Sequence, residues 1–404
     1  MIATFLSLQA IRIAGLLLSY AIIIFLNRSQ GPAGLGKYLY LINTVIVTGT
    51  IAALGTPTLV QRLGAKLGYD QIGAGTRLIL FRRLPVMSAV AVVGVVALLA
   101  QSYQPLSRLN VIALILSAFG FAVTLVLIET LRIAYGPHLS EVQRNLVRPA
   151  LIFGLLIAGL DAVWAIPFGV LVTLALALAL TSQTLRQDPI INPAIRAYVS
   201  ERGRDLTTVF ILGTVSLVFG AMDVLLFGLL EDPAETGIYG TGSRYGMLVN
   251  VALMAGNAQM MQNLAKVASQ TDQEGRSLAL LRAQVQMVRL SSSILLVALT
   301  AALPLYSWIV DLPAAQLWPY FAVVAISFWI QGMLGPVNIF LVQAHEVGRL
   351  IHYHMWGILV FGIVSGALFL TNTNLAIPIG AAAGTNTVKL LSWWRIHHSR
   401  NLSI

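Results

Sequence analysis

The 404-residue chain has no cysteine, which excludes disulfides, thiolate metal ligands and thiol nucleophiles. It is also poor in charge: Asp, Glu, Lys and Arg make up 10% of the residues, against roughly 25% in soluble domains. A soluble protein of this length with so few charges would be unable to cover its surface. No polar stretch is long enough for a separate soluble domain, and the basic soluble face that nucleic-acid binding requires is missing.

Hydrophobic residues fill the chain instead: they make up 57% of it, and the mean hydropathy is +0.83. A helix of about 20 mainly apolar residues spans a bilayer, and such stretches recur along the whole sequence. A β-barrel would need alternating strands, which the run Leu171–Leu180 does not provide. We predict an all-α membrane protein with about twelve transmembrane helices, at Leu6–Leu26, Tyr38–Val60, Leu84–Gln101, Val111–Ala134, Leu146–Leu160, Ala162–Thr181, Leu206–Leu230, Tyr239–Met260, Leu290–Ile309, Trp318–Val342, Leu350–Leu370 and Leu375–Trp394.

Basic residues predict the orientation of these helices. Loops on the cytoplasmic side of a membrane carry an excess of Lys and Arg. With twelve spans, 20 of the 25 Lys and Arg fall on one side, which also holds both termini. We therefore expect a multi-pass protein of the bacterial inner membrane with both termini in the cytoplasm. The first span is too long for a signal-peptide core, so we expect it to be retained.

A short internal repeat divides the predicted helices into two sets of six. The segment Gly31–Tyr38 matches Asp232–Tyr239 at a spacing of 201 residues, and each copy joins the first two spans of its half. Because six spans separate the copies, both halves have the same orientation, as in a parallel repeat. We predict an N-terminal lobe of residues 1–185, a cytoplasmic linker of residues 186–205 and a C-terminal lobe of residues 206–404.

The repeat, together with local motifs, resembles a known superfamily. The first loop has the pattern Gly-Pro-x-x-x-Gly-x-Tyr, and Asp223–Arg244, Leu146–Pro149 and Gly335-Pro336 are similar to segments of the polysaccharide branch of the multidrug/oligosaccharidyl-lipid/polysaccharide exporters. The resemblance implies two parallel six-helix lobes around a central cavity and alternating access. It also implies an O-antigen flippase (Wzx-type) that moves undecaprenyl-pyrophosphate-linked oligosaccharide outward without a cofactor. The expected partners are this lipid-linked substrate, membrane lipids, and the polysaccharide polymerase and chain-length machinery.

Charged residues inside predicted spans are the first candidates for the substrate site, because such charges usually face a bundle interior or water. Arg12 shares one face of the first span with Ser19, and we expect both to line the cavity; the alternative for Arg12 is a side chain that extends to the cytoplasmic interface. Asp223 and Arg244 lie at similar depths in the seventh and eighth spans. They form either a structural ion pair or a gate that exchanges Asp223 for the substrate's pyrophosphate.

The remaining candidates are one acidic residue and several amides. Glu129 and Arg132 are spaced i,i+3 and predict an intrahelical ion pair, with a role for Glu129, like Asp223, in ion coupling as the alternative. Neutral amides on helix faces suit sugar hydroxyls, although they also bond helix to helix; these are Asn250, Asn257, Gln331 and Asn338. We predict no catalytic residues. We also predict no metal site, because His345, His352 and His354 have only one acidic residue nearby, Glu346, and the chain has no cysteine.

Two other functions compete with the flippase. A drug exporter of the same superfamily is the runner-up, although the arginine in the first span disfavours a cationic cargo. A membrane polysaccharide polymerase is the third, but it would need a sizeable periplasmic loop for its chemistry, and the longest plausible one, Gln101–Asn110, offers only Arg108. We therefore predict a transporter and no enzyme.

Overall fold

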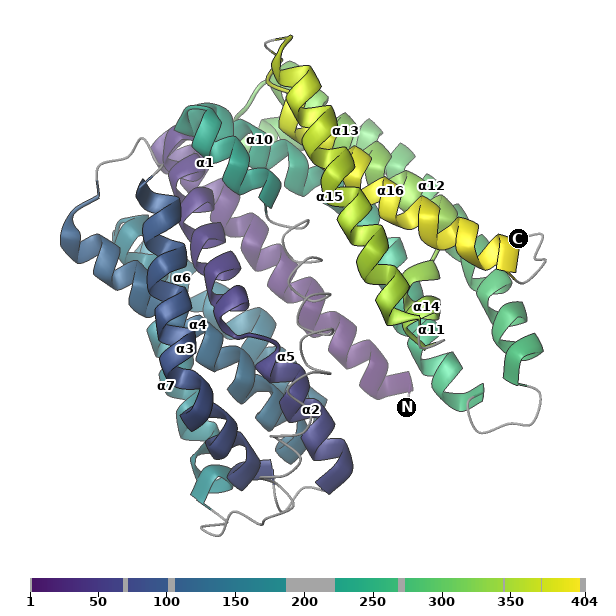
Figure 1. Ribbon diagram of the computed structural model, residues 1–404. Helices are drawn as coiled ribbons and strands as arrows, with labels where there is room; N and C mark the ends of the chain where they lie inside the picture. Colours follow the sequence, from purple (N-terminus) through teal and green to yellow (C-terminus); the bar gives the residue numbers. More distant parts are fainter. Residues whose placement is uncertain are drawn as a thin grey trace. The chain divides into compact units, whose positions relative to one another are not determined.

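The computed structural model describes residues 2–67, 72–100, 106–186, 222–267, 273–343, 346–371 and 373–399. The regular structure of these residues is entirely helical, and the chain groups into two units, Met1–Pro233 and Ala234–Ile404 (Figure 1). Seven of the described helices are long and apolar enough to cross a membrane. The prediction of an all-helical fold is confirmed, whereas the number of twelve spans stays a prediction. The linker and most of the seventh span lie outside the described residues.

The N-terminal unit begins with a long bent helix, α1 (Ile2–Ala52), which joins the first two predicted spans (Figure 1). The bend is at Gly31, whose φ of 70° suits glycine, and the following Pro32 lacks the N–H that would continue the hydrogen-bond ladder. The second predicted span is wrong at its end, because the helix stops at Ala52. Leu54 and Gly55 have positive φ there. The other helices are α2 (Thr56–Leu67), α3 (Ile72–Ala100), α4 (Arg108–Tyr135), α5 (Pro137–Val142), the π-helix η2 (Gln143–Val147), α6 (Arg148–Ile157), α7 (Ala162–Arg186) and residues 222–230.

The fifth predicted span also begins in the wrong place. Helices α5, η2 and α6 follow one another without a gap from Pro137 to Ile157, so that the helical segment starts nine residues before Leu146. Arg144 consequently lies inside it rather than in a loop, and Arg148, which is within the predicted span, begins α6. The predicted break at Asp161 is confirmed, because Gly159 has a φ of 88° and the Asp161 carboxylate accepts from the backbone N–H of Val163 at the start of α7.

The C-terminal unit comprises eight helical elements within the residues described. They are α10 (Pro233–Gly246), the 3-10 helix η3 (Met247–Val249), α11 (Asn250–Val267), α12 (Gln273–Val310), α13 (Ala314–Leu334), α14 (Val337–Gln343), α15 (Val347–Phe369) and α16 (Ala376–Ser399).

Two predicted spans of this unit have other bounds in the structure. The tenth predicted span, Trp318–Val342, is wrong, because α13 ends at Leu334. It is interrupted there by Gly335, which has a φ of 75°, and by Pro336. The ninth span starts earlier than predicted, within the 38-residue α12.

Corresponding details recur in both units at nearly the spacing of the sequence repeat. The Tyr40 hydroxyl donates to the Leu98 carbonyl, and the Tyr245 hydroxyl donates to the Leu299 carbonyl. The two tyrosines are 205 residues apart and the two leucines 201. A Gly-Pro pair with positive φ at the glycine ends α4 at Gly136, and another ends α13 at Gly335, 199 residues later. These pairs support the internal repeat.

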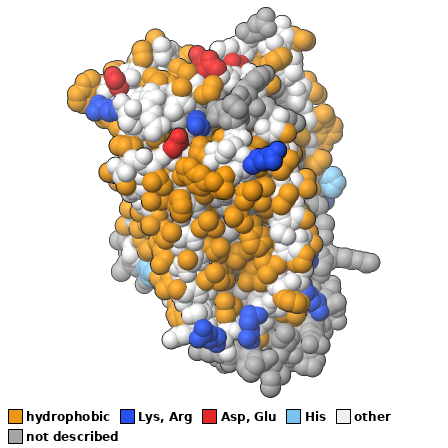
Figure 2. Space-filling view, turned by 90° about the vertical axis from the view of Figure 1, so that its left-hand side faces the viewer, with side chains coloured by type: hydrophobic (Ala, Val, Ile, Leu, Met, Phe, Trp, Pro, Cys, Tyr) orange, Lys and Arg blue, Asp and Glu red, His pale blue; other side chains and the backbone are white. Residues whose placement is uncertain are grey.

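The outward-facing side chains of the long helices are apolar. Val93 on α3, Val297 on α12 and Ile363 on α15 are each more than 60% exposed. Figure 2 shows apolar side chains spread across the middle of one face, with charged side chains toward its two ends. Soluble proteins rarely expose apolar areas of this kind, so the surface is that of a multi-pass membrane protein.

Candidate functional site

The most extensive polar network in the described residues lies within the N-terminal unit, around Glu141. The Glu141 carboxylate accepts two hydrogen bonds from Arg12, Nη2 to Oε1 at 2.9 Å and Nε to Oε2 at 3.2 Å. Arg132 donates to the same Oε1 at 3.1 Å, and Asn145 donates to Oε2 at 2.6 Å. The Glu141 side chain is 5% exposed and that of Arg12 is 41% exposed. Arg12 therefore binds a buried carboxylate rather than only extending to the interface.

A second buried carboxylate, Glu129, extends this network. Its side chain is 6% exposed, and the predicted pair with Arg132 is confirmed at 3.2 Å. Glu129 also accepts a hydrogen bond from Gln61 of α2 at 2.7 Å and lies 3.8 Å from Arg144. The two carboxylates are thus paired with three arginines: Arg12 with Glu141, Arg144 with Glu129, and Arg132 with both. These ion pairs fix the positions of the side chains, but their net contribution to stability is small because the desolvation cost offsets the attraction.

Two glycines position this network. Gly136 turns the chain back at the end of α4, so that Glu129 faces Arg144 and Arg132 faces Glu141 in an antiparallel arrangement. Gly15 allows α1 to approach η2, because a Cβ at that position would lie 2.4 Å from the Asn145 carbonyl oxygen. The close approach brings Arg12 to Glu141, 129 residues away in the sequence.

A partly enclosed cavity of about 250 Å³ adjoins the network. Arg144 and Arg148 line it together with the hydroxyl-bearing Thr50, Thr124 and Thr173. The π-helix η2 supplies Arg144, and π-bulges frequently occur at functional sites. The Arg148 guanidinium carbon lies 4.9 Å from the ring centroid of Phe121, a cation–π contact that orients this side chain. The three threonine hydroxyls each donate to a carbonyl of their own helix, so that their oxygens remain as acceptors. The two guanidinium groups are the part of the lining that suits an anionic ligand.

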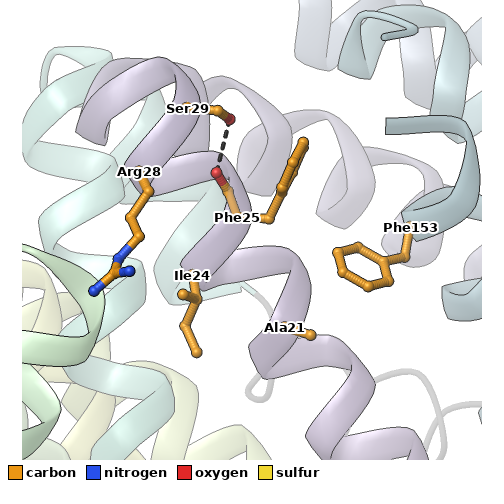
Figure 3. Close-up of a pocket in the computed structure, with 6 residues that line it drawn as sticks. All are labelled: Ala21, Ile24, Phe25, Arg28, Ser29 and Phe153. Carbon is orange, nitrogen blue, oxygen red and sulfur yellow. Dashed lines mark hydrogen bonds between the residues drawn. The ribbon is translucent and has the colours of Figure 1, made fainter. Parts of the chain in front are cut away.

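A larger hollow of about 520 Å³ lies between α1 and α6, and it is open and apolar (Figure 3). Phe25 and Phe153 form its wall, with ring centroids 6.0 Å apart at 84°. The Ser29 hydroxyl donates to the Phe25 carbonyl at 2.7 Å, so it is engaged with its own helix. Arg28 is the single charged side chain among its six lining residues. With so few polar groups, this hollow is a poor site for a sugar.

The other predicted residues of the N-terminal unit contribute less. The Ser19 hydroxyl donates to the Gly15 carbonyl at 2.9 Å within its own helix, and its place in the cavity lining stays a prediction. Asp223 accepts from the Val224 backbone N–H at 2.8 Å. Its proposed partner Arg244 is in α10 of the other unit, so that the pair stays a prediction.

The predicted amides all belong to the C-terminal unit. Gln331 on α13 is 8% exposed and makes long contacts to Ser327 Oγ at 3.4 Å and to Thr385 Oγ1 of α16 at 3.5 Å. This arrangement corresponds to the helix-bonding alternative. Asn250 begins α11, and the buried Oδ1 atoms of Asn257 and Asn338 have no hydrogen-bond partner among the described residues.

Four functional candidates were missed from the sequence. Glu141 and Arg144 fell outside the predicted spans because the start of the fifth helix was placed too late, although Pro137 marks a helix start. Arg148 was counted with the cytoplasmic charges although it lies inside the predicted fifth span. Lys389 was counted with the cytoplasmic charges, yet it is 6% exposed within the C-terminal unit. Within the described ranges no cluster of three or more His, Asp or Glu residues is placed to hold a metal ion.

Comparison with known proteins identifies the fold. No family model matches the sequence, and no curated protein matches it. Among solved structures, the lipid II flippase MurJ in an inward closed conformation aligns with a TM-score of 0.69 at 12% identity, over 100% of this chain and 88% of that one. A MOP superfamily transporter from Pyrococcus furiosus aligns at 0.66 with 11% identity over 97% and 95%. An outward-facing multidrug resistance MATE family transporter aligns at 0.64 with 12% identity over 98% and 95%.

These likenesses cover essentially the whole chain, so the architecture of these transporters extends from one end of the protein to the other. At 11–12% identity they show a shared fold and leave the cargo open. The protein is therefore a multi-pass membrane protein with the fold of the MATE and MurJ structures.

Proposed function

We propose that the protein is a flippase that moves an undecaprenyl-pyrophosphate-linked oligosaccharide, such as an O-antigen repeat unit, from the cytoplasmic to the periplasmic leaflet of a bacterial inner membrane. The observation that carries this proposal is the arginine-lined cavity of the N-terminal unit. A pyrophosphate within an apolar bundle needs cationic partners, and a guanidinium binds phosphate oxygens in a bidentate manner. Arg144 and Arg148 line one hollow and supply two such groups.

The size of the cavity limits what it holds. About 250 Å³ is below the roughly 300–1,000 Å³ of typical small-molecule pockets. We therefore assign to it the phosphates of the substrate and not the whole oligosaccharide; the three threonine oxygens can accept from a sugar hydroxyl, since each donates to its own helix. Arg12 contributes indirectly, since its bonds to Glu141 hold η2 and thereby Arg144 in place.

A multidrug exporter is the second candidate, since one of the structural neighbours is a multidrug resistance transporter. A cationic drug requires an available carboxylate. Glu129 and Glu141, however, each already bind two arginines. A polysaccharide polymerase is the least supported, because the polar groups of the N-terminal unit line a binding cavity and do not form a pair of catalytic groups.

The test is deletion of the gene followed by complementation. Deletion should abolish surface polysaccharide and leave lipid-linked repeat units on the cytoplasmic leaflet. Arg148→Gln and Arg144→Gln should reduce export at least about tenfold, the effect of losing one charge-assisted hydrogen bond. Arg108→Gln, at the exposed start of α4, is the matched control and should export normally. Normal export by the Arg144/Arg148 double variant at wild-type protein level would contradict the proposal.

A further inference from the structure

Lys389 on α16 is a buried cation with little to bind. Lys389 is 6% exposed, and its Nζ donates one hydrogen bond, to the Gly335 carbonyl at 3.4 Å. A lysine ammonium has three N–H donors, and this distance exceeds the usual 2.7–3.2 Å range. Within the described residues, the ammonium group is therefore poorly satisfied.

The acceptor belongs to the break between α13 and α14. Pro336 has no N–H, so the helix cannot continue, and carbonyl groups at the end of α13 are left for other donors. Arg289 of α12 donates its Nε–H to the Met333 carbonyl at 2.6 Å. Lys389 reaches the Gly335 carbonyl at 3.4 Å, as a second donor beside the backbone N–H of Val337, which donates to the same oxygen at 2.9 Å. Cations at a helix C-terminus are stabilising. The two differ in one respect: arginine stays charged, whereas a buried lysine changes its protonation state readily.

No anion compensates Lys389 in the part of the C-terminal unit that the structure describes. Helix α16 packs against α13, α14 and α15, and neither α13 nor α14 contains a charged residue. On α15, His354 is buried, and its Nδ1 lies 2.7 Å from the Leu350 carbonyl of the same helix. Glu346, which precedes α15, already binds Arg349 at 2.9 Å and Arg395 at 3.1 Å. The other titratable side chains of α15 are Arg349, His352 and Tyr353.

We propose that Lys389 is a proton-binding site of the C-terminal unit and that its proton holds the break between α13 and α14 closed. Protonated Lys389 attracts the dipole of the Gly335 carbonyl across 3.4 Å, and we call this contact the Lys389 latch. On release, one N–H bond breaks, the proton passes to water and the electron pair stays on Nζ. The neutral amine is a weaker donor, so α14 is freed from α16. The ligand of the site is a proton, and no co-reactant is needed.

The latch is a property of the fold, whereas its use to couple a proton gradient to transport rests on the proposed flippase function. A proton that binds one conformation better than another shifts the equilibrium between them. Protonation from one side of the membrane and release to the other would thus bias the position of α14.

The absence of cysteine allows a direct test. Val337→Cys places a thiol at a fully buried position on α14 next to the break. Val310→Cys, also fully buried, lies at the end of α12, 21 residues or about 30 Å along the helix from Arg289. Maleimide reacts with the thiolate, so both labelling rates rise with pH. The labelling rate of Val337→Cys divided by that of Val310→Cys corrects for this shared dependence. In otherwise wild-type protein this ratio should rise with pH by about tenfold.

Variants at Lys389 fix the two states. Lys389→Met should give the high ratio at every pH, and Lys389→Arg should give the low one, because its guanidinium stays protonated. His354→Gln should keep the pH dependence. A ratio in wild-type protein that does not change with pH overturns the latch, as does a pH dependence that survives in Lys389→Met or disappears only in His354→Gln. If neither Lys389 variant folds, the wild-type series decides.

A second measurement separates the latch from the flippase. In proteoliposomes with an imposed pH gradient, Lys389→Met should flip lipid-linked oligosaccharide at a rate that no longer responds to the gradient. If wild-type protein does not flip this lipid at all, the proposed function fails while the labelling result stands. If flipping by Lys389→Met still follows the gradient, the coupling role of Lys389 fails and the flippase stands.

Discussion

The Nη2 atom of Arg12 and the Oε1 atom of Glu141 lie 2.9 Å apart and join the first helix of the N-terminal unit to α5. Glu141 in turn binds Arg132, which binds Glu129, so that α1, α4 and α5 meet in one chain of ion pairs. This relationship gives the arginine of the first span a defined structural role and leads to the first prediction.

Removing one partner of the Arg12–Glu141 pair should be worse than removing both. Glu141→Gln leaves Arg12 and Arg132 without their shared carboxylate, and such an unmatched charge typically costs about 1–3 kcal/mol. Arg12→Gln/Glu141→Gln should recover part of that loss. The measurement is the apparent melting temperature of purified protein in detergent. Additive effects of the two substitutions would show that the pair does not couple them.

Gly136→Ala should destabilise the N-terminal unit through its backbone. Gly136 has φ 90° and ψ 174°, a region that is essentially restricted to glycine, and occupying it with another residue costs about 1–3 kcal/mol. A Cβ there would meet no atom within 4 Å, so the cost is conformational rather than steric. Gly154→Ala is the matched control, since it is also unobstructed but lies in α6 with helical geometry. The control should melt at or above the wild-type temperature, and equal losses in both would contradict this explanation.

Gly15→Ala should separate α1 from η2. The added Cβ would lie 2.4 Å from the backbone oxygen of Asn145, which cannot move without shifting η2. We expect lower thermal stability and weaker export, because Arg144 of the cavity belongs to η2. Gly362→Ala on α15 provides the control, as nothing lies within 4 Å of its Cβ. Wild-type export and melting by Gly15→Ala would show that α1 and η2 need not approach so closely.

The predicted orientation is tested with fusions to topology reporters. A cytoplasmic reporter fused after Arg83 or Arg289 should be active, and a periplasmic reporter fused after Arg108 or Glu235 should be active. The physical reason is the excess of basic residues on one side of the predicted spans. Periplasmic activity after Arg83 would reverse the assigned topology.

The membrane class was determined by the sequence alone. A chain with 57% hydrophobic and 10% charged residues has to place its apolar side chains in lipid. Local chemistry was also readable: the Glu129–Arg132 pair follows from i,i+3 spacing, and the break before α7 follows from Asp161. Helix ends were less predictable where glycine and proline interrupt apolar sequence. A loop was predicted from Gly31, where the helix only bends, and no break was predicted at Gly335, where the helix ends, because hydropathy alone does not distinguish the two cases.

The tertiary structure decided which charges meet. Glu141 is the partner of Arg12 only because Gly136 reverses the chain and Gly15 admits η2, and contacts over 129 residues leave no local pattern. Lys389 has the sequence context of an interfacial cation beside Trp393, yet packing of α13, α14 and α15 removes it from solvent. Burial depends on neighbouring helices, and for that reason the same residue type is a surface charge in one place and a proton-binding group in another.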